Sequence, residues 1–297
     1  MTENSIKPVL SGDRPRFGPG GNSTAFYDAG CKSTKEAPAW LHRIGLDAYE
    51  FEASRGVNAS EETLRFIGRE AAENDIRMSV HAPYFISLSG TEIDKRLKSL
   101  DYIRDSLRAA ALLGAEIIVV HTGSASKISR REAMELASDT LCKALADIPD
   151  NGVAIGLETM GKQNQLGTLD EVIELCKIDK RLSPVVDFGH LNARATGGVF
   201  PNKDAYRSVF DKIAGSLGDE KAKNLHCHFS KIEWTASGEK RHLTFSDNLY
   251  GPAFEPLMEC IYAEGVTPVI ICESAGTMSD DALQMKTYYE RIRSWKN

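Results

Sequence analysis

The sequence predicts a single-domain α/β protein, a (β/α)8 TIM barrel in which eight parallel strands are surrounded by helices. Two observations support this fold class. Short β-rich runs alternate with longer helical runs about eight times over roughly 250 residues, which is typical of this barrel. Several of the short runs are nearly unbroken apolar stretches, such as Ile117-Ile-Val-Val120 and Val269-Ile-Ile271. Such runs suit parallel strands that are buried on both faces.

The expected strands, in order, are Arg16–Gly18, Ala48–Glu52, Arg77–His81, Ile117–His121, Val153–Glu158, Pro184–Asp187, Leu225–Phe229 and Pro268–Glu273. Helices are expected over 60–74, 94–113 and 130–145. Another helix follows Thr168, which forms a capping-box pattern with Glu171. The last helix is expected to be capped by Ser279 and to end near Trp295.

The domain prediction is a flexible N-terminal tail over residues 1–14 and one barrel over residues 15–297. A doubly wound open sheet is the alternative. It is disfavoured because Gly18-Pro-Gly-Gly21, after the first strand, has the wrong spacing for a dinucleotide-binding loop and contains a proline.

The composition is that of an ordinary globular protein. The 297 residues carry a formal net charge of −6, with 42% hydrophobic and 26% charged residues. No apolar run is long enough to cross a bilayer, and the N-terminus has no signal-peptide pattern, so we expect no membrane association and a cytoplasmic location. The six cysteines include no Cys-x-x-Cys pair and are expected to be free thiols.

Histidines and acids fall at the ends of the expected strands. Those at the ends of six of the eight strands, or close behind them, are His81, His121, Glu158, Asp187, His190, His226, His228 and Glu273. In a barrel the carboxyl ends of all strands meet at one mouth, so these side chains are expected to converge. Imidazoles and carboxylates together are the ligand set of Zn²⁺, Mn²⁺ or Fe²⁺. Any one of them alone is more often a hydrogen-bonded or ion-paired residue, and it is the joint pattern that predicts a metal centre. His42 is interpreted as structural. Glu50 and Glu52, near the end of the second strand, are interpreted as solvent-facing or ion-paired residues, with a place in the outer shell of the metal site as the alternative.

At these positions the chain resembles the endonuclease IV family, within the xylose-isomerase-like barrel superfamily, from about Phe17 to Met285. The motifs of the resemblance are His81-Ala-Pro-Tyr84, His121-Thr-Gly123, Glu158-Thr159, Asp187-Phe-Gly-His190, His226 and Glu273. Each motif is short, and their order and spacing make them specific.

The resemblance implies a barrel with three zinc ions. His81, His121 and Glu158 would hold the first ion, and Glu158 would bridge to a second ion held also by Asp187, His226 and Glu273. His190 and His242 match the ligands of the third ion. Lys240 stands where the family has an aspartate, and Glu239 is the nearest candidate replacement. The implied cofactor is therefore two or three zinc ions, with Mn²⁺ as the alternative.

The function expected from this resemblance is hydrolysis of the DNA backbone at abasic sites, with Glu158 and Glu273 as catalytic residues. A metal-dependent sugar isomerase or epimerase of the same superfamily is the alternative, and its substrate would be a small sugar. The pair His81 and His121 favours the hydrolase, because a one-metal epimerase does not need it. A non-catalytic binding barrel is a third interpretation, and it would leave the ligand set without a use.

Four residues are expected to bind substrate, namely Tyr84, His228, Lys231 and Arg241. The DNA backbone would also need cations around the mouth. The candidates in mouth loops are Lys127, Arg130, Arg131, Lys162, Arg194, Lys231, Lys240 and Arg241. An ordinary solvated rim would contain the same residue types.

Overall fold

A computed structural model of the chain describes residues 14–296, and all eight expected strands are present within two residues of their expected bounds. The strands are β1 (Arg16–Pro19), β2 (Ala48–Glu52), β3 (Arg77–His81), β4 (Ile117–His121), β5 (Ala154–Glu158), β6 (Leu182–Asp187), β7 (His226–Phe229) and β10 (Val269–Cys272). They form one sheet in the order β1-β10-β7-β6-β5-β4-β3-β2, and all of the pairs are parallel.

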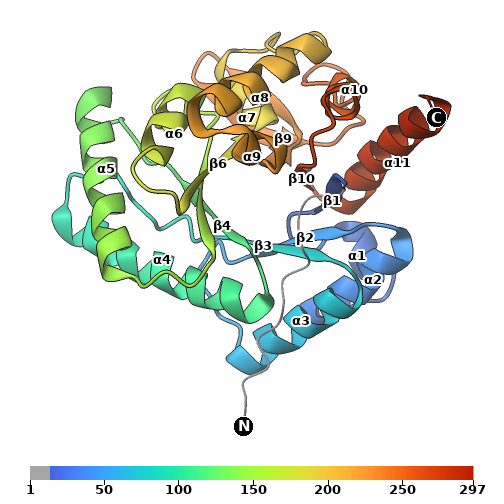
Figure 1. The fold of residues 1–297 in the computed structure, drawn as a ribbon, viewed down its shortest axis with the longest axis horizontal. Helices are drawn as coiled ribbons and strands as arrows, with labels where there is room; N and C mark the ends of the chain where they lie inside the picture. The colour runs from blue at the N-terminus through green and yellow to red at the C-terminus, as the bar shows by residue number, and fades with distance from the viewer. Residues whose placement is uncertain (1–13, 297) are drawn as a thin grey trace.

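The sheet closes between its first two strands. Gly20 bridges Glu50 in parallel, and the amide of Asp47 donates to the carbonyl of Phe17 at 3.1 Å. This closure needs a close approach of the two backbones, because a Cβ on Gly18 would lie 1.7 Å from the carbonyl oxygen of Ala48. The result is a (β/α)8 TIM barrel, as the sequence predicts (Figure 1).

Helices surround the strands (Figure 1). They are α1 (Thr24–Asp28), η1 (Thr34–Glu36), α2 (Ala37–Ile44), α3 (Glu61–Glu73), α4 (Ile93–Leu113), α5 (Arg130–Asp147), α6 (Leu169–Cys176), α7 (Phe188–Arg194), α8 (Lys203–Leu217), α9 (Asp219–Lys223), α10 (Glu255–Glu264) and α11 (Met278–Lys296). The capping box before α6 is formed as expected, since Thr168 and Glu171 bond each other's backbone amides. The expected cap of the last helix is wrong, because Ser279 lies inside the first turn of α11.

A two-stranded hairpin interrupts the barrel pattern after β7. It consists of β8 (Lys231–Thr235) and β9 (Gly238–Leu243), which pair antiparallel. The sequence predicts a loop here, and the structure has a hairpin instead. Because it follows the carboxyl end of β7, the hairpin stands over the mouth of the barrel.

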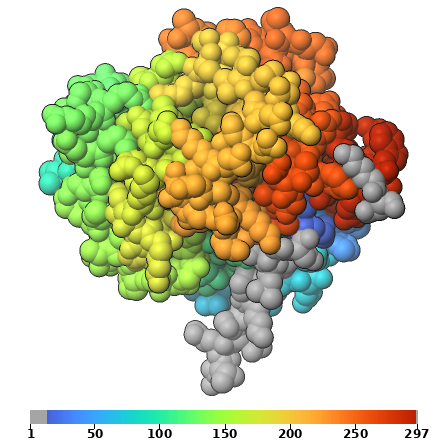
Figure 2. All heavy atoms as spheres, turned by 45° about the horizontal axis from the view of Figure 1, so that its top comes forward, coloured from blue at the N-terminus to red at the C-terminus, as the bar shows by residue number. Residues whose placement is uncertain are grey.

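The described chain packs around one extensive apolar core and a separate small cluster of Ala48, Val269 and Ile271. On the face seen in Figure 2, segments from the middle of the chain lie next to segments near its C-terminus. The six cysteines are free thiols, and all except Cys142 are buried. Within residues 14–296, no helix is long and apolar enough to span a membrane. The expected N-terminal tail, residues 1–14, lies outside the described residues apart from Arg14.

Candidate metal centre

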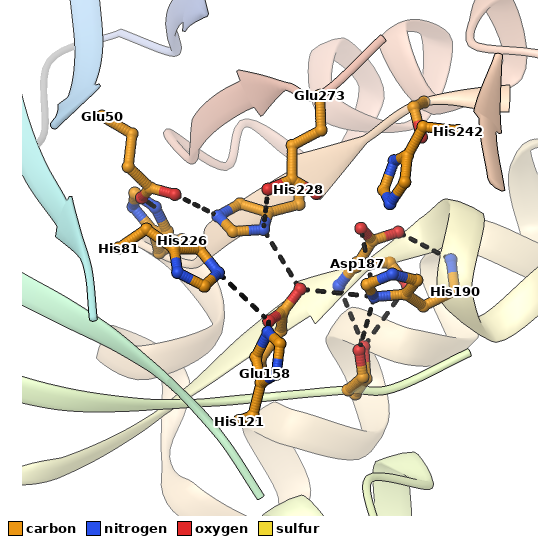
Figure 3. A network of polar contacts seen from close by, with 12 residues as sticks. Glu50, His81, His121, Glu158, Asp187, His190, His226, His228, His242 and Glu273 are labelled. Carbon is orange, nitrogen blue, oxygen red and sulfur yellow. Dashed lines mark hydrogen bonds and ion pairs between the residues drawn. The ribbon is translucent and has the colours of Figure 1, made fainter. Parts of the chain in front are cut away.

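Strand register places the histidines and acids at one level of the barrel. His121 at the end of β4 pairs with Glu158 at the end of β5, and Asp187 at the end of β6 pairs with His228 on β7. Since all of these strands run in the same direction, their carboxyl ends direct these side chains into the same mouth (Figure 3).

The first group of side chains matches its expectation. His81, His121 and Glu158 each offer a ligand atom, and these three atoms lie within 4.8 Å of one another. Nε2 of His121 is 3.3 Å from Oε2 of Glu158, and Nε2 of His81 is 3.8 Å from the same oxygen. The three residues therefore face a common point.

The second group contains a different histidine from the one expected. Glu158, Asp187, His228 and Glu273 bring their ligand atoms within 4.8 Å of one another. Nδ1 of His228 lies 3.2 Å from Oε1 of Glu158 and 3.3 Å from Oε1 of Glu273. His226 does not belong to this group, which corrects its expected place beside Asp187 and Glu273.

The physical reason is the register of β7. His226 pairs with Val185 and Val269, whereas His228 pairs with Asp187. His226 therefore lies two residues, roughly 7 Å, deeper in the barrel than His228. Both side chains face the same side of the strand, so the alternation of the sequence cannot distinguish them.

The third group forms through a β-bulge. His190, Glu239 and His242 have ligand atoms within 4.8 Å of one another. Arg241 pairs with Glu233 and Glu239 pairs with Trp234, so Lys240 is an extra residue in β9. An extra residue changes the alternation, which is why Glu239 and His242 face the same side although three positions separate them. Glu239 thus lies where the resemblance calls for an aspartate, and Lys240 instead contacts Glu233 on the surface.

The histidine rings are held in orientations that suit metal binding. Nδ1 of His81 contacts the carbonyl of Ala82 at 2.9 Å, Nδ1 of His190 contacts the carbonyl of Thr159 at 3.0 Å, and Nδ1 of His242 contacts Oγ of Ser230 at 2.8 Å. With Nδ1 engaged by the protein, Nε2 of each ring is the nitrogen left for an ion.

Two buried carboxylate oxygens also indicate that ions belong here. Oε2 of Glu158 and Oδ2 of Asp187 have no hydrogen-bond partner among the described residues, although Glu158 is 1% exposed and Asp187 is fully buried. Imidazole nitrogens lie 3.3 Å and 3.2 Å from these two oxygens without forming a hydrogen bond. A buried ionised oxygen without a hydrogen bond is costly, and a divalent cation would satisfy it. The donor set of nitrogen and carboxylate oxygen therefore fits Zn²⁺ or Mn²⁺.

The pKa values of the site are shifted so that, without metal ions, positive charge on several imidazoles balances the buried carboxylates. Burial alone would raise the pKa of Glu158, but hydrogen bonds from His190 and His228 hold it well below its usual value. Burial lowers the pKa of His81, but its contact with Glu158 and the charge of Glu52 outweigh this and raise it to about 10. Burial dominates at His121, whose pKa falls to about 4, and at Asp187, whose pKa rises to about 6.

Comparison with known proteins places the chain in a family. The model of the xylose isomerase-like TIM barrel family matches residues 38–295. The chain belongs to the xylose isomerase-like TIM barrel family. It is 30% identical over 254 residues to an uncharacterized protein of Methanocaldococcus jannaschii, a match that covers 84% of this chain and 90% of that protein.

Other similar proteins include some named as endonucleases and some named as epimerases. A probable endonuclease 4 of Mycoplasma pneumoniae is 28% identical over 224 residues, which are 73% of this chain and 75% of that protein. Endonuclease IV of Thermus thermophilus superposes with a TM-score of 0.68 at 19% identity and covers 93% of this chain and 100% of its own. A D-tagatose 3-epimerase-like protein superposes with a TM-score of 0.67 at 20% identity and covers 95% of this chain and 100% of its own. At these identities the superpositions show the fold alone.

A pocket of about 660 Å³ opens over the three groups of the xylose isomerase-like barrel. Its lining includes Tyr84, Lys162 and Met278 as well as most of the metal-ligating candidates. The ring of Tyr84 lies 5.3 Å from that of His81 and 5.1 Å from that of His121, centroid to centroid, and the residue is 59% exposed. Tyr84 therefore lies on the pocket wall beside two candidate ligands, and its expected contact with substrate stays a prediction.

Most of the candidate rim cations brace loops instead of facing the pocket. Lys231 donates to the carbonyls of Phe245 and Asp247, and Arg241 pairs with Glu233 at 2.6 Å. Of the eight cations named in the sequence analysis, Lys162 alone lines the pocket among the residues that the structure describes. Lys231 and Arg241 do not line the pocket, and their expected role in substrate binding stays a prediction.

Two acids on β2 lie closer to the site than their interpretation as solvent-facing or ion-paired residues implies. Glu50 is fully buried beneath His228, and Glu52 lies on the pocket wall. Partial removal from water and the charges of Glu50 and Glu273 raise the pKa of Glu52 to about 7, although the residue keeps an exposed surface and His81 opposes the shift. The period-two spacing of Glu50 and Glu52 was the available signal, because it directs both side chains to one face of a barrel strand.

Proposed function

We propose that this protein is a zinc-dependent phosphodiesterase that hydrolyses the DNA backbone at abasic sites. The observation that carries the proposal is the position of Glu158 between two groups. Its Oε2 faces His81 and His121, while its Oε1 faces His228. A carboxylate shared in this way is typical of sites with two metal ions about 4 Å apart, which clamp the attacking and leaving oxygens of a phosphate.

The relatives support this reading. Proteins named probable endonuclease 4 match most of the chain. Among the five groups of described residues that could hold an ion, three contain the residues for which the resemblance implies zinc, with His228 in place of His226 and Glu239 in place of an aspartate. The third group, with Glu239 in place of an aspartate, keeps one carboxylate and two imidazoles.

The side chains then have distinct tasks. Bound ions would supply Lewis acidity and lower the pKa of water. Glu158 would hold the two ions at a fixed separation. Glu273, whose pKa is lowered to about 2 because the effect of His228 outweighs burial, would stay ionised and orient the attacking water. Lys162 and Tyr84 would contact the phosphate and sugar at the pocket wall.

The main test combines metal analysis with a cleavage assay. His121→Ala removes one imidazole of the first group, so we expect it to lower the zinc content by about one ion per chain and to abolish nicking of a duplex with one abasic site. His42→Ala is the matched control, because His42 lies on α2 and contacts the carbonyl of Asn74 away from the mouth. Unchanged zinc content in His121→Ala would contradict the first group.

A sugar isomerase or epimerase is the second candidate. The group of Glu158, Asp187, His228 and Glu273 alone would hold one metal, and two glutamates could exchange protons with a ketose as acid and base. The single lysine on the pocket wall also suits a small substrate better than a long duplex. A ketose panel run beside the nicking assay separates the two. One exchangeable Mn²⁺ per chain with epimerisation, and no nicking, would favour the isomerase.

A further inference from the structure

A buried polar cluster lies directly beneath the second metal group. It consists of Glu50 on β2, Ser79 on β3, and His226 and His228 on β7. Glu50 and His228 are fully buried, and Ser79 and His226 are at most 5% exposed. The cluster therefore occupies the interior of the barrel, where every polar contact has a large effect on side-chain orientation.

Glu50 is the centre of this cluster. Its Oε2 accepts a hydrogen bond from Oγ of Ser79 at 2.7 Å and contacts Nε2 of His226 at 2.9 Å. Its Oε1 lies 2.9 Å from Nε2 of His228. Ser79 and His226 thus hold one oxygen of the carboxylate by hydrogen bonds, and the other oxygen lies at ion-pair distance from His228. Figure 3 shows Glu50 with the two histidines.

His228 has the opposite ring orientation from the other candidate ligands. His81, His190 and His242 have Nδ1 engaged by the protein, whereas His228 has Nε2 against Glu50 and Nδ1 directed toward Glu158 and Glu273. Both ring nitrogens of His228 face carboxylates, since Nδ1 is 3.2 Å from Oε1 of Glu158 and Nε2 is 2.9 Å from Oε1 of Glu50. A carboxylate accepts only, so when an ion replaces the proton on Nδ1 the remaining hydrogen is on Nε2, facing Glu50. The lone pair of a neutral His228 ring is then on Nδ1 and points at the metal group.

We infer that Glu50 is a positioning residue that selects the Nδ1-coordinating form of His228. His226 and Ser79 in turn position Glu50. The two histidines of β7 then have different tasks: His228 faces the ion, and His226 supports the carboxylate that orients it.

This inference rests on the proposed metal centre but not on the substrate. The group with His228 is common to the phosphodiesterase and the isomerase readings, so failure to cleave DNA would leave the inference standing. Likewise, a result that refutes the role of Glu50 would not decide between phosphodiester hydrolysis and sugar isomerisation.

The first test measures zinc affinity by competition with a chelator. Removing a carboxylate that orients a ligating histidine typically weakens metal binding 10- to 100-fold. We expect Glu50→Ala and Glu50→Gln to weaken one zinc ion per chain by about this factor and to leave the other ions unchanged. Glu116→Gln is the control, since it removes a carboxylate that pairs with Arg77 at the amino end of the barrel.

The variant His226→Gln separates positioning from ligation. A positioning role predicts that all ions are retained and that the affinity for one of them falls less than in Glu50→Ala. Loss of a whole ion in His226→Gln would mean that His226 is itself a ligand and would overturn the inference. So would an unchanged zinc affinity in Glu50→Ala.

A measurement on the unmodified protein decides the matter even if the variants fold poorly. In the zinc-loaded protein with ¹⁵N-labelled histidine, long-range ¹H–¹⁵N spectra report which ring nitrogen carries the hydrogen. We expect His228 to be protonated at Nε2 and metal-bound at Nδ1, and His81, His190 and His242 to show the reverse. Zinc on Nε2 of His228 would refute the assignment.

Discussion

The metal-free centre should bind zinc in competition with protons, and the structure gives the size of this effect. The pKa of His81 is raised to about 10, and those of His190 and His228 are raised well above their usual value against the effect of burial, mainly by Asp187 and Glu158 at His190 and by Glu273 and Glu50 at His228. At neutral pH these imidazoles are therefore protonated, and a metal ligand must be neutral. Displacing the His81 proton at pH 7 costs about 4 kcal/mol, since three pH units separate it from its pKa.

The sign of the pH dependence follows directly. Raising the pH toward the pKa of about 10 makes the His81 proton easier to displace, so zinc affinity should rise with pH and fall as the solution is acidified. Each proton released contributes about a tenfold change in affinity per pH unit. A histidine with an ordinary pKa near 6.5 would give almost no dependence above about pH 7.5.

Chelator competition between about pH 6.5 and 8.5 measures this slope, and calorimetry in two buffers of different ionisation enthalpy counts the protons. The variant His81→Gln should lose about one proton from the count, while His42→Ala should lose none. A zinc affinity that is constant above about pH 7.5, without proton release, would refute the reasoning that imidazolium ions occupy the metal-free centre.

Three further predictions concern single positions. Glu273→Gln should keep the fold and abolish activity, checked by circular dichroism beside the nicking assay; a fully active variant would exclude its orienting role. Glu239→Ala should lower the zinc content by about one ion, because it removes the carboxylate of the third group, which lies 3.4 Å from Nε2 of His190. Retention of all ions would exclude Glu239 as a ligand. Gly18→Ala should lower the free energy of unfolding by about 3 kcal/mol or more, because the new Cβ would overlap the backbone of Ala48. Denaturant titration measures this change, and an unchanged stability would show that β1 and β2 can separate at little cost.

The barrel could be predicted because its signals are local. Apolar runs such as Ile117–Val120 identify buried parallel strands, and Thr168 with Glu171 marks a helix start without reference to the rest of the chain. The arrangement of the mouth follows from topology alone, since His121 and Glu158 end neighbouring parallel strands.

The sequence could not predict how deep each histidine of β7 lies in the barrel, or how the strands pair residue by residue. His226 and His228 alternate identically, and the pairing of β7 with β6 decides which of them reaches the level of Asp187. The bulge at Lys240 depends on how β9 pairs with β8, so the role of Glu239 could be guessed only as a near neighbour of the expected position. Both differences arise from non-local strand pairing, which a single sequence does not encode in its periodicity.

The surroundings of Glu158 bear on the choice between the two candidate reactions. An isomerase would need a glutamate that exchanges a proton with a substrate carbon, and so a carboxylate oxygen open to the pocket. Both oxygens of Glu158 are instead directed at imidazoles, with Oε2 toward His121 and His81 and Oε1 toward His228 and His190. If ions fill both groups, neither oxygen is free to act as a base, and Glu158 serves only to hold charge. That arrangement suits a reaction whose difficulty lies in stabilising a phosphate rather than in removing a proton from carbon.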